Sequence, residues 1–271
     1  MNEFNQAHKW VFVSFSGGKD STASYLKTVE QYPKHIITCI FTDTGYEHPE
    51  TYDYLRWFND NVHPVMRLAS RIKSEKNGRR YFENVHIAWN RSVQWVRDNC
   101  HTVLDEIKDR HKRYPTIPPY PSGNARHCTK TCKVRVFEKH LRSIVPTSER
   151  HLAVAVIGVR RGESAKRAGR SETAINTDCG HDEWYPIVDF GLLDAFRAAY
   201  KADIRFNQVY RYSERSNCVW CPFAGMDTIK ETEKRHPNSM KEMIEFENVS
   251  GWTLQHNRSV GESCASGFCE V

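Results

Sequence analysis

The chain has 271 residues and a net charge of +6, with 39% hydrophobic and 27% charged residues, which is typical of a globular protein with a sizeable core. No apolar run reaches the roughly 18 residues that a membrane-spanning helix needs, and residues 1–9 lack the pattern of a secretion signal. We therefore expect a cytoplasmic protein that does not enter a membrane. Nine cysteines are not expected to form disulfides in that compartment, so their spacing points to metal.

The first half of the chain alternates between apolar runs and amphipathic segments. Buried strands are predicted over 10–15, 35–41 and 65–69, and helices over 20–31 and 51–61. Two successive β–α–β units predict a parallel sheet with right-handed crossovers. In such a sheet, ligands bind at the carboxyl ends of the strands.

The second half is less regular. Residues 71–84 are polar and basic and are predicted to form a loop, whereas 90–110 carries apolar residues at helical spacing and predicts one amphipathic helix. A fourth strand is predicted over 153–159, a short extended segment over 185–190 and a helix over 192–204. Two short helices are expected near the end of the chain.

These elements predict two parts. Residues 1–205 are expected to form an α/β domain with a doubly wound, mainly parallel five-stranded sheet. Residues 206–271 are expected to form a helical extension that carries cysteines.

The segment between the first strand and the first helix has the features of a phosphate-binding loop. Gly17 and Gly18 can adopt positive φ and leave no Cβ in the way of an anion. The helix N-terminus adds N–H donors and a partial positive charge, and Lys19 adds a full charge. An ordinary glycine turn is the alternative. The residues expected to contact ATP or its phosphates are Ser14, Ser16, Gly17, Gly18, Lys19, Asp20, Ser21, Thr22 and Asp43.

Asp43 follows the second predicted strand and so reaches the same edge of the sheet as the loop. From there it could hold Mg²⁺ or a ribose hydroxyl. The alternative is that Asp43–Thr44–Gly45 is simply a turn.

Two pairs of cysteines have the spacing of metal ligands. Cys218 and Cys221 form a C-x-x-C pair, and Cys128 and Cys132 are one helical turn apart. Four thiolates suit either zinc or a [4Fe–4S] cluster, and spacing does not separate the two. The alternatives are a redox dithiol and unrelated cysteines.

Several of these motifs resemble known families. Residues 14–21, which include Ser-Gly-Gly-Lys-Asp-Ser, resemble the PP-loop of the N-type ATP pyrophosphatases. Later segments are similar to the phosphoadenosine phosphosulfate (PAPS) reductase family, and the resemblance covers about residues 10–225. These segments are 41–52, 128–133, 158–164, 185–189 and 218–222.

The intact loop resembles the ATP-cleaving branch, which includes the ATP pyrophosphatase component of DNA phosphorothioation, more than the sulfonucleotide reductases. The four cysteines resemble the iron–sulfur sites of adenylylsulfate reductases and of that branch. Two departures stand out. Three residues separate Cys128 from Cys132, which are adjacent in the reductases, and Cys264 and Cys269 only approximate the Glu-Cys-Gly motif of the reductase tail. These tail cysteines are either reactive thiols or incidental.

The resemblance implies an adenine nucleotide alpha hydrolase-like fold and a reaction that begins with ATP. Lys19, with Mg²⁺, would neutralise the leaving pyrophosphate, and Asp43 would help to hold the metal or the ribose. An acceptor would be adenylylated and then receive sulfur. Arg160, Arg161, Lys166 and Arg167 would bind the acceptor's phosphate, and Arg160 and Arg161 are also taken as catalytic.

A basic segment supports a polyanionic acceptor. Residues 126–170 contain 12 lysines and arginines against 3 acidic residues, which suits a nucleotide or a nucleic acid, although a solvated basic face is the alternative. The expected partners are a nucleotide, a nucleic acid acceptor, a cysteine desulfurase or thiol sulfur donor, and a second copy of the chain. The alternative functions are PAPS or adenylylsulfate reduction with release of sulfite, and a non-catalytic nucleotide-binding subunit.

Overall fold

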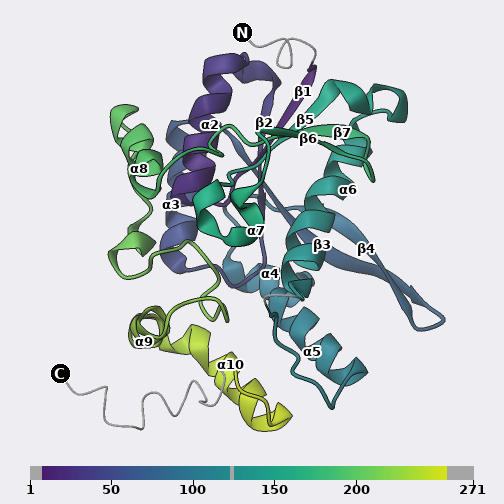
Figure 1. Cartoon of the computed structure of the whole chain (residues 1–271). Helices are drawn as coiled ribbons and strands as arrows, with labels where there is room; N and C mark the ends of the chain where they lie inside the picture. Colours follow the sequence, from purple (N-terminus) through teal and green to yellow (C-terminus); the bar gives the residue numbers. More distant parts are fainter. Residues whose placement is uncertain (1–7, 123–124, 255–271) are drawn as a thin grey trace.

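The computed structural model of the chain describes residues 8–122 and 125–254, and a seven-stranded sheet lies at its centre (Figure 1). The strand order is β4-β3-β2-β1-β5-β7-β6. The strands are β1 (Trp10–Ser14), β2 (Ile37–Thr42), β3 (Val65–Lys76), β4 (Arg79–His86), β5 (Ala153–Val156), β6 (Thr173–Asn176) and β7 (His181–Trp184).

The helices are α2 (Lys19–Gln31), α3 (Pro49–Asn61), α4 (Val93–Asn99), α5 (Val103–Arg113), α6 (Arg135–Ile144), α7 (Ala165–Ala168), α8 (Leu192–Lys201), α9 (Met226–Arg235) and α10 (Pro237–Ser250). Short 3-10 turns are η1 (Lys34–Ile36), η3 (Thr147–Leu152), η4 (Arg161–Glu163) and η5 (Gln208–Arg211), and η2 (Thr129–Val134) is a π-helix. None of the helices in the described ranges is long and apolar enough to cross a bilayer.

The predicted doubly wound α/β architecture is confirmed. Strands β3, β2, β1, β5 and β7 run parallel. Alternate residues of β1 enter different cores, because successive side chains of a strand point to opposite faces. Val11 and Val13 pack with α2 and α3, whereas Phe12 packs with α6 on the other face.

The sheet has seven strands rather than the predicted five, because an antiparallel strand pairs at each edge. Strand β4 pairs with β3, and β6 pairs with β7. The loop predicted over 71–84 is wrong: these residues form the outer part of the β3–β4 hairpin. Asn77 and Gly78 form its turn with φ values of 51° and 70°, and such an Asn-Gly pair is a strong hairpin signal.

Two other expectations need correction. The single helix predicted over 90–110 is broken into α4 and α5, because Thr102 begins α5 with a capping box: its backbone N–H donates to the Asp105 carboxylate at 2.8 Å. The extended segment predicted over 185–190 is a pair of turns, closed by Val188 N–H to Tyr185 C=O at 3.0 Å and by Phe190 N–H to Ile187 C=O at 2.9 Å.

The residues after 205 pack against the end of the sheet where the parallel strands deliver their loops. Helices α9 and α10 bury Ile229, Met240 and Met243 against Leu104 and Trp220. This second core brings the cysteine-bearing segments together. Residues 206–254 therefore share their contacts with the α/β part of the chain.

Candidate functional site

The glycine loop is shaped by its own backbone. Gly17 has φ of +72°, and a Cβ at this position would lie 3.0 Å from Leu55 Cγ, so only glycine fits. Asn207 Nδ2 donates to the Gly17 carbonyl at 3.0 Å, and Ser21 Oγ donates to the Gly18 carbonyl at 2.9 Å. These bonds hold the loop open in front of α2, whose N-terminus carries a partial positive charge.

A cavity of about 200 Å³ lies beside this loop. It is closed on one side by Gly158, where an added Cβ would come within 2.8 Å of the Asp20 carbonyl oxygen. Strand β5 therefore leaves the sheet in contact with the first turn of α2. The lining residues are Ser14, Ser16, Gly18, Lys19, Asp20, Ser21, Ile157, Gly158, Tyr210, Arg215 and Ser216.

Lys19 is the charged group at the centre of this arrangement. Its residue is 7% exposed, and its Nζ lies 3.5 Å from Asp20 Oδ2 and 5.1 Å from the centre of the Tyr210 ring. Burial lowers the pKa of Lys19, and the nearby Arg160 and Arg215 lower it further, against the opposing effect of Asp20. The loop is thus surrounded by excess positive charge, which an anionic ligand would neutralise.

Of the predicted acceptor-binding cations, Arg160 and Arg167 lie near the loop residue Asp20, and three of the four have carboxylate partners. Arg160 Nε donates to Asp20 Oδ1 at 2.7 Å. Arg161 pairs with Asp189, Arg167 pairs with Glu163, and Lys166 is exposed on α7.

The basic residues around Arg167 come from three separate segments. Burial lowers the pKa of Arg167, and so does the charge of Arg126, Arg170 and Arg215. Arginines far apart in the sequence therefore gather in one region beside the cavity. A polyanion could bind to this region through bidentate contacts.

Asp43 and Thr22 are placed differently from the expectation. Asp43 is 2% exposed; its Oδ2 accepts from Arg67 Nε at 2.7 Å, and its Oδ1 accepts from the Tyr52 hydroxyl at 2.7 Å and from Gly45 N–H at 2.8 Å. Both oxygens are therefore used to organise the end of β2 rather than to face a metal or ribose. Thr22 points into the core, where its hydroxyl is 2.9 Å from the Tyr54 hydroxyl.

The sequence did not reveal the contribution of residues 207–216. Tyr210 accepts a hydrogen bond from the Lys19 N–H at 2.8 Å, so its hydroxyl sits where a phosphate oxygen would meet the start of α2. Arg215 and Ser216 complete the wall of the cavity. The available signal was a stretch of polar and aromatic residues without strand or helix periodicity.

The four predicted metal-ligating cysteines gather in the second core, beside the end of β2. Burial raises the pKa of each thiol. In addition to burial, the charge of a Cys128 thiolate raises the pKa of Cys132, Cys218 and Cys221. All four sulfurs therefore lie in one neighbourhood. Cys264 and Cys269 lie outside the described residues.

The spacing of the sulfurs bears on which group they fit. Within 8–122 and 125–254, no three of them lie within 4.8 Å of one another. Two thiolates on one tetrahedral zinc lie about 3.8 Å apart, given bonds of about 2.3 Å. Zinc and a [4Fe–4S] cluster are the two groups that four thiolates suit.

One polar pair connects the cysteine neighbourhood to the sheet. Lys133 Nζ donates to Glu47 Oε1 at 2.9 Å, and Glu47 forms an isolated β-bridge with Cys218. Burial would lower the pKa of the half-buried Lys133, but the Glu47 carboxylate outweighs this effect and raises it. Glu47 follows the end of β2 by five residues, so this contact lies close to the edge that carries the loop.

A parallel sheet that presents a glycine loop, a basic cavity and a helix N-terminus at one edge defines a nucleotide-binding α/β protein. The model of the phosphoadenosine phosphosulfate reductase domain matches residues 10–224. The chain therefore belongs to this family.

Individual relatives are more distant. An uncharacterised 37.8 kDa protein of Escherichia phage 186 is 29% identical over 258 residues, which cover 88% of this chain and 74% of that protein. An uncharacterised protein of Methanocaldococcus jannaschii is 23% identical over 261 residues, or 93% of this chain, but the match spans only 46% of the archaeal protein. The crystal structure of PAPS reductase from Candida auris, in a phosphate complex, is 10% identical with a TM-score of 0.46, covering 77% of this chain and 80% of that one.

Proposed function

We propose that this chain binds ATP at the glycine loop, cleaves it between the α and β phosphates and transfers AMP to an acceptor that then receives sulfur. The observation that carries the proposal is that Lys19 and Arg215 line the loop cavity, with Arg160 held beside it by Asp20. The intact Ser-Gly-Gly-Lys-Asp-Ser sequence supports ATP rather than a nucleotide that is already made.

The chemistry is a displacement at the α-phosphorus. An acceptor oxygen forms a bond to the α-phosphorus, and the bond to the bridging α–β oxygen breaks, so that its electron pair leaves with pyrophosphate. Lys19, with Mg²⁺, lowers the barrier because it stabilises the charge that develops on the leaving group. A sulfur nucleophile then displaces AMP from the acceptor.

Asp43 takes an indirect part in this proposal. Its ion pair with Arg67 and its bond to Tyr52 fix the turn that follows β2. This turn leads directly to Glu47 and to the cysteine neighbourhood. Asp43 is thus a positioning residue.

We propose that Cys128, Cys132, Cys218 and Cys221 hold the [4Fe–4S] cluster that the family resemblance implies. When bound, such a cluster supplies electron transfer or the handling of sulfur. Cys132 is 1% exposed, and the other three thiols are half-buried.

A nucleic acid is the acceptor that the charges favour. The outer part of the β3–β4 hairpin exposes Arg71, Lys73 and Lys76, and a cavity of about 740 Å³ beside it is lined by six basic residues, five arginines and Lys112, against three acidic ones. Two-stranded β-ribbons fit the major groove of DNA, and basic side chains bind its phosphates. The hairpin and the arginines around Arg167 are therefore the proposed acceptor surface.

The decisive experiment measures pyrophosphate release from ATP and Mg²⁺ by the full chain, purified without oxygen, in the presence of DNA or RNA. Replacing Lys19 by Ala should lower the rate by about 10²–10³-fold, the usual cost of removing one group that stabilises developing charge. The matched control is Lys27→Ala, on the same helix, where the side chain pairs only with Glu30 at the surface.

Two results would replace this proposal. Thiol-dependent release of sulfite from PAPS or adenylylsulfate, without pyrophosphate release from ATP, would make the chain a reductase, as the family match allows. Tight binding of ATP without turnover under every condition would make it a non-catalytic nucleotide-binding subunit.

A further inference from the structure

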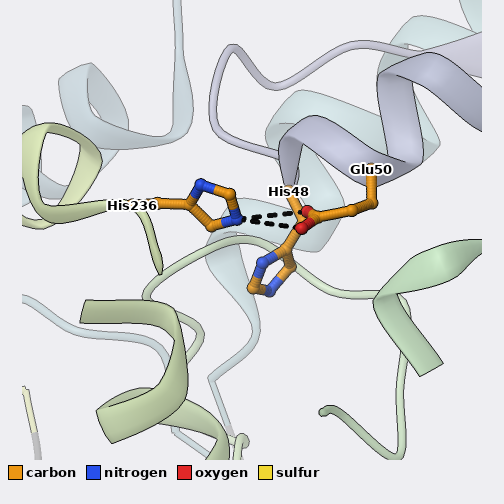
Figure 2. A group of neighbouring side chains, drawn as sticks. All are labelled: His48, Glu50 and His236. Carbon is orange, nitrogen blue, oxygen red and sulfur yellow. Dashed lines mark hydrogen bonds and ion pairs between the residues drawn. The ribbon is translucent and has the colours of Figure 1, made fainter. Parts of the chain in front are cut away.

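A second polar cluster lies apart from both the loop and the cysteines. It brings together His48 and Glu50 at the start of α3, Tyr212 just after η5, and His236 between α9 and α10 (Figure 2 shows the two imidazoles and the carboxylate). These residues come from three segments that are far apart in the sequence. Neither the proposed ATP chemistry nor the cysteine site uses them.

The four side chains meet at contact distances. The Tyr212 hydroxyl donates to Glu50 Oε2 at 2.9 Å. The Tyr212 hydroxyl oxygen also lies 3.1 Å from His48 Nδ1 and 3.3 Å from His236 Nε2. His236 Nε2 lies 3.1 Å from Glu50 Oε1 (Figure 2). One ligand atom each from His48, Glu50 and His236 can be chosen so that all three lie within 4.8 Å of one another.

Hydrogen bonding alone leaves this cluster incomplete. His48 is 0% exposed, and its Nε2 has no hydrogen-bond partner in the structure. The Tyr212 hydroxyl has a single proton to share among three neighbours. A buried imidazole with an unsatisfied nitrogen is costly, and a cation bound to the other nitrogen, Nδ1, would offset that cost.

The geometry points to a zinc site, and we propose that His48, Glu50, Tyr212 and His236 bind one Zn²⁺ ion. Ligands on a tetrahedral zinc with Zn–N and Zn–O bonds of 2.0–2.2 Å stand about 3.3–3.6 Å apart. Four of the six separations between these groups are 2.9–3.3 Å, close to those distances, and the ligand atoms of His48, Glu50 and His236 all lie within 4.8 Å of one another. Imidazole nitrogens and carboxylate oxygens are zinc ligands, and Tyr212 would join them as a phenolate whose proton is released on binding.

The site would be closed and structural. A catalytic zinc keeps one position for water or substrate, whereas here the protein fills all four. The ion would connect the first turn of α3, which follows the turn organised by Asp43, to the two C-terminal helices. Zinc binding would therefore fix the helices that flank the cysteine neighbourhood.

The proposal is tested on the full chain, stripped of metal with a chelator and then titrated with zinc chloride under reducing conditions. Bound zinc is counted by mass spectrometry, and its ligands are identified by X-ray absorption. Nitrogen and oxygen ligands give a shell near 2.0–2.2 Å, whereas thiolates give one near 2.3 Å. This readout separates the proposed site from zinc taken up by the cysteines.

The wild-type chain is expected to bind one equivalent of zinc with nitrogen and oxygen ligands. His236→Ala should abolish that equivalent, and Tyr212→Phe, which keeps the ring, should weaken it at least tenfold. His35→Ala is the matched control, because His35 is exposed and far from the cluster in sequence. Circular dichroism checks the fold, and Tyr212→Phe decides the test if His236→Ala does not fold.

Three results would overturn the proposal. The first is zinc with only sulfur ligands in the wild type. The second is nitrogen- and oxygen-ligated zinc that persists at full affinity in both variants. The third is a preference for Fe²⁺ over zinc, which would indicate a site with two histidines, one carboxylate and open positions.

Discussion

The glycine loop and the cysteine neighbourhood lie at the same end of the sheet, but they are built differently. The loop is complete within one strand–helix connection: Gly17 has the required φ, and Lys19 is already in place beside the cavity. The cysteines come from two segments about 85 residues apart, and in the described residues no three sulfurs lie within 4.8 Å of one another.

The difference shows that the order of a site without its ligand depends on which contacts hold its residues in place. A loop between paired strands and a helix is held by backbone hydrogen bonds, so it keeps its shape without a ligand. A site assembled by helices packed in a small core gains part of its order from the group that it binds. The two regions should therefore respond separately to mutation.

The largest effect is expected for Cys218→Ser with Cys221→Ser. Loss of two thiolates should remove nearly all of the bound iron, because a four-iron cluster needs four ligands. Pyrophosphate release should change by less than about threefold, since neither cysteine lines the loop cavity. Iron analysis and the pyrophosphate assay measure the two sites in one preparation, and a parallel loss of both would show that they are coupled.

Gly158→Ala is expected to do the opposite: it disturbs the glycine loop and leaves the cysteine neighbourhood intact. The new Cβ would press on the backbone of Asp20 and Ser21, and overpacking of this kind costs about 1–3 kcal/mol. ATP affinity should fall about 5- to 150-fold, as measured by calorimetry, while the iron content stays constant. Gly162→Ala is the control, because nothing lies within 4 Å of its added Cβ; equal losses in both variants would contradict the prediction.

Tyr210→Phe should strengthen nucleotide binding. The variant frees the Lys19 N–H, which now donates to the tyrosine hydroxyl, while the ring stays over the Lys19 ammonium group. A net hydrogen bond is worth about 0.5–1.5 kcal/mol, so the Kd for an ATP analogue should fall about 2- to 10-fold. Weaker binding would instead mean that the hydroxyl itself contacts the nucleotide.

The acceptor surface is expected to respond about as weakly as the Tyr210 contact. The double change Lys73→Glu and Lys76→Glu should weaken DNA binding about 3- to 10-fold and reduce the salt dependence by about two ion equivalents, because two phosphate contacts are lost. ATP affinity should not change. Lys201→Glu, on exposed α8, is the control, and fluorescence anisotropy at several salt concentrations provides the measurement.

The sequence predicted the features that depend on neighbouring residues. The strand–loop–helix unit at Gly17 and Lys19 follows from local pattern, and so does the parallel order of the central strands. The expectation that the two cysteine pairs share one metal or cluster rests on their spacing and stays a prediction.

The features that it missed depend on tertiary contacts or on weighing local signals differently. The Arg67 side chain that pairs with Asp43 comes from another strand. Tyr210, which contacts Lys19 in the loop, is 191 residues away from it in the sequence. The β3–β4 hairpin was not predicted because its exposed, basic strands lack an apolar face, although Asn77–Gly78 was a local turn signal. The break before α5 could likewise have been predicted from the capping pattern of Thr102 and Asp105.

The two antiparallel edge strands also limit how copies of the chain can associate. Strand β6 has only four residues, and the outer half of β4 is charged and exposed. Short or charged borders of this kind discourage the addition of a strand from another molecule. We therefore expect the hydrogen-bonded sheet to end within one copy, and an assembly of two copies to be built from helical faces rather than by continuing the sheet.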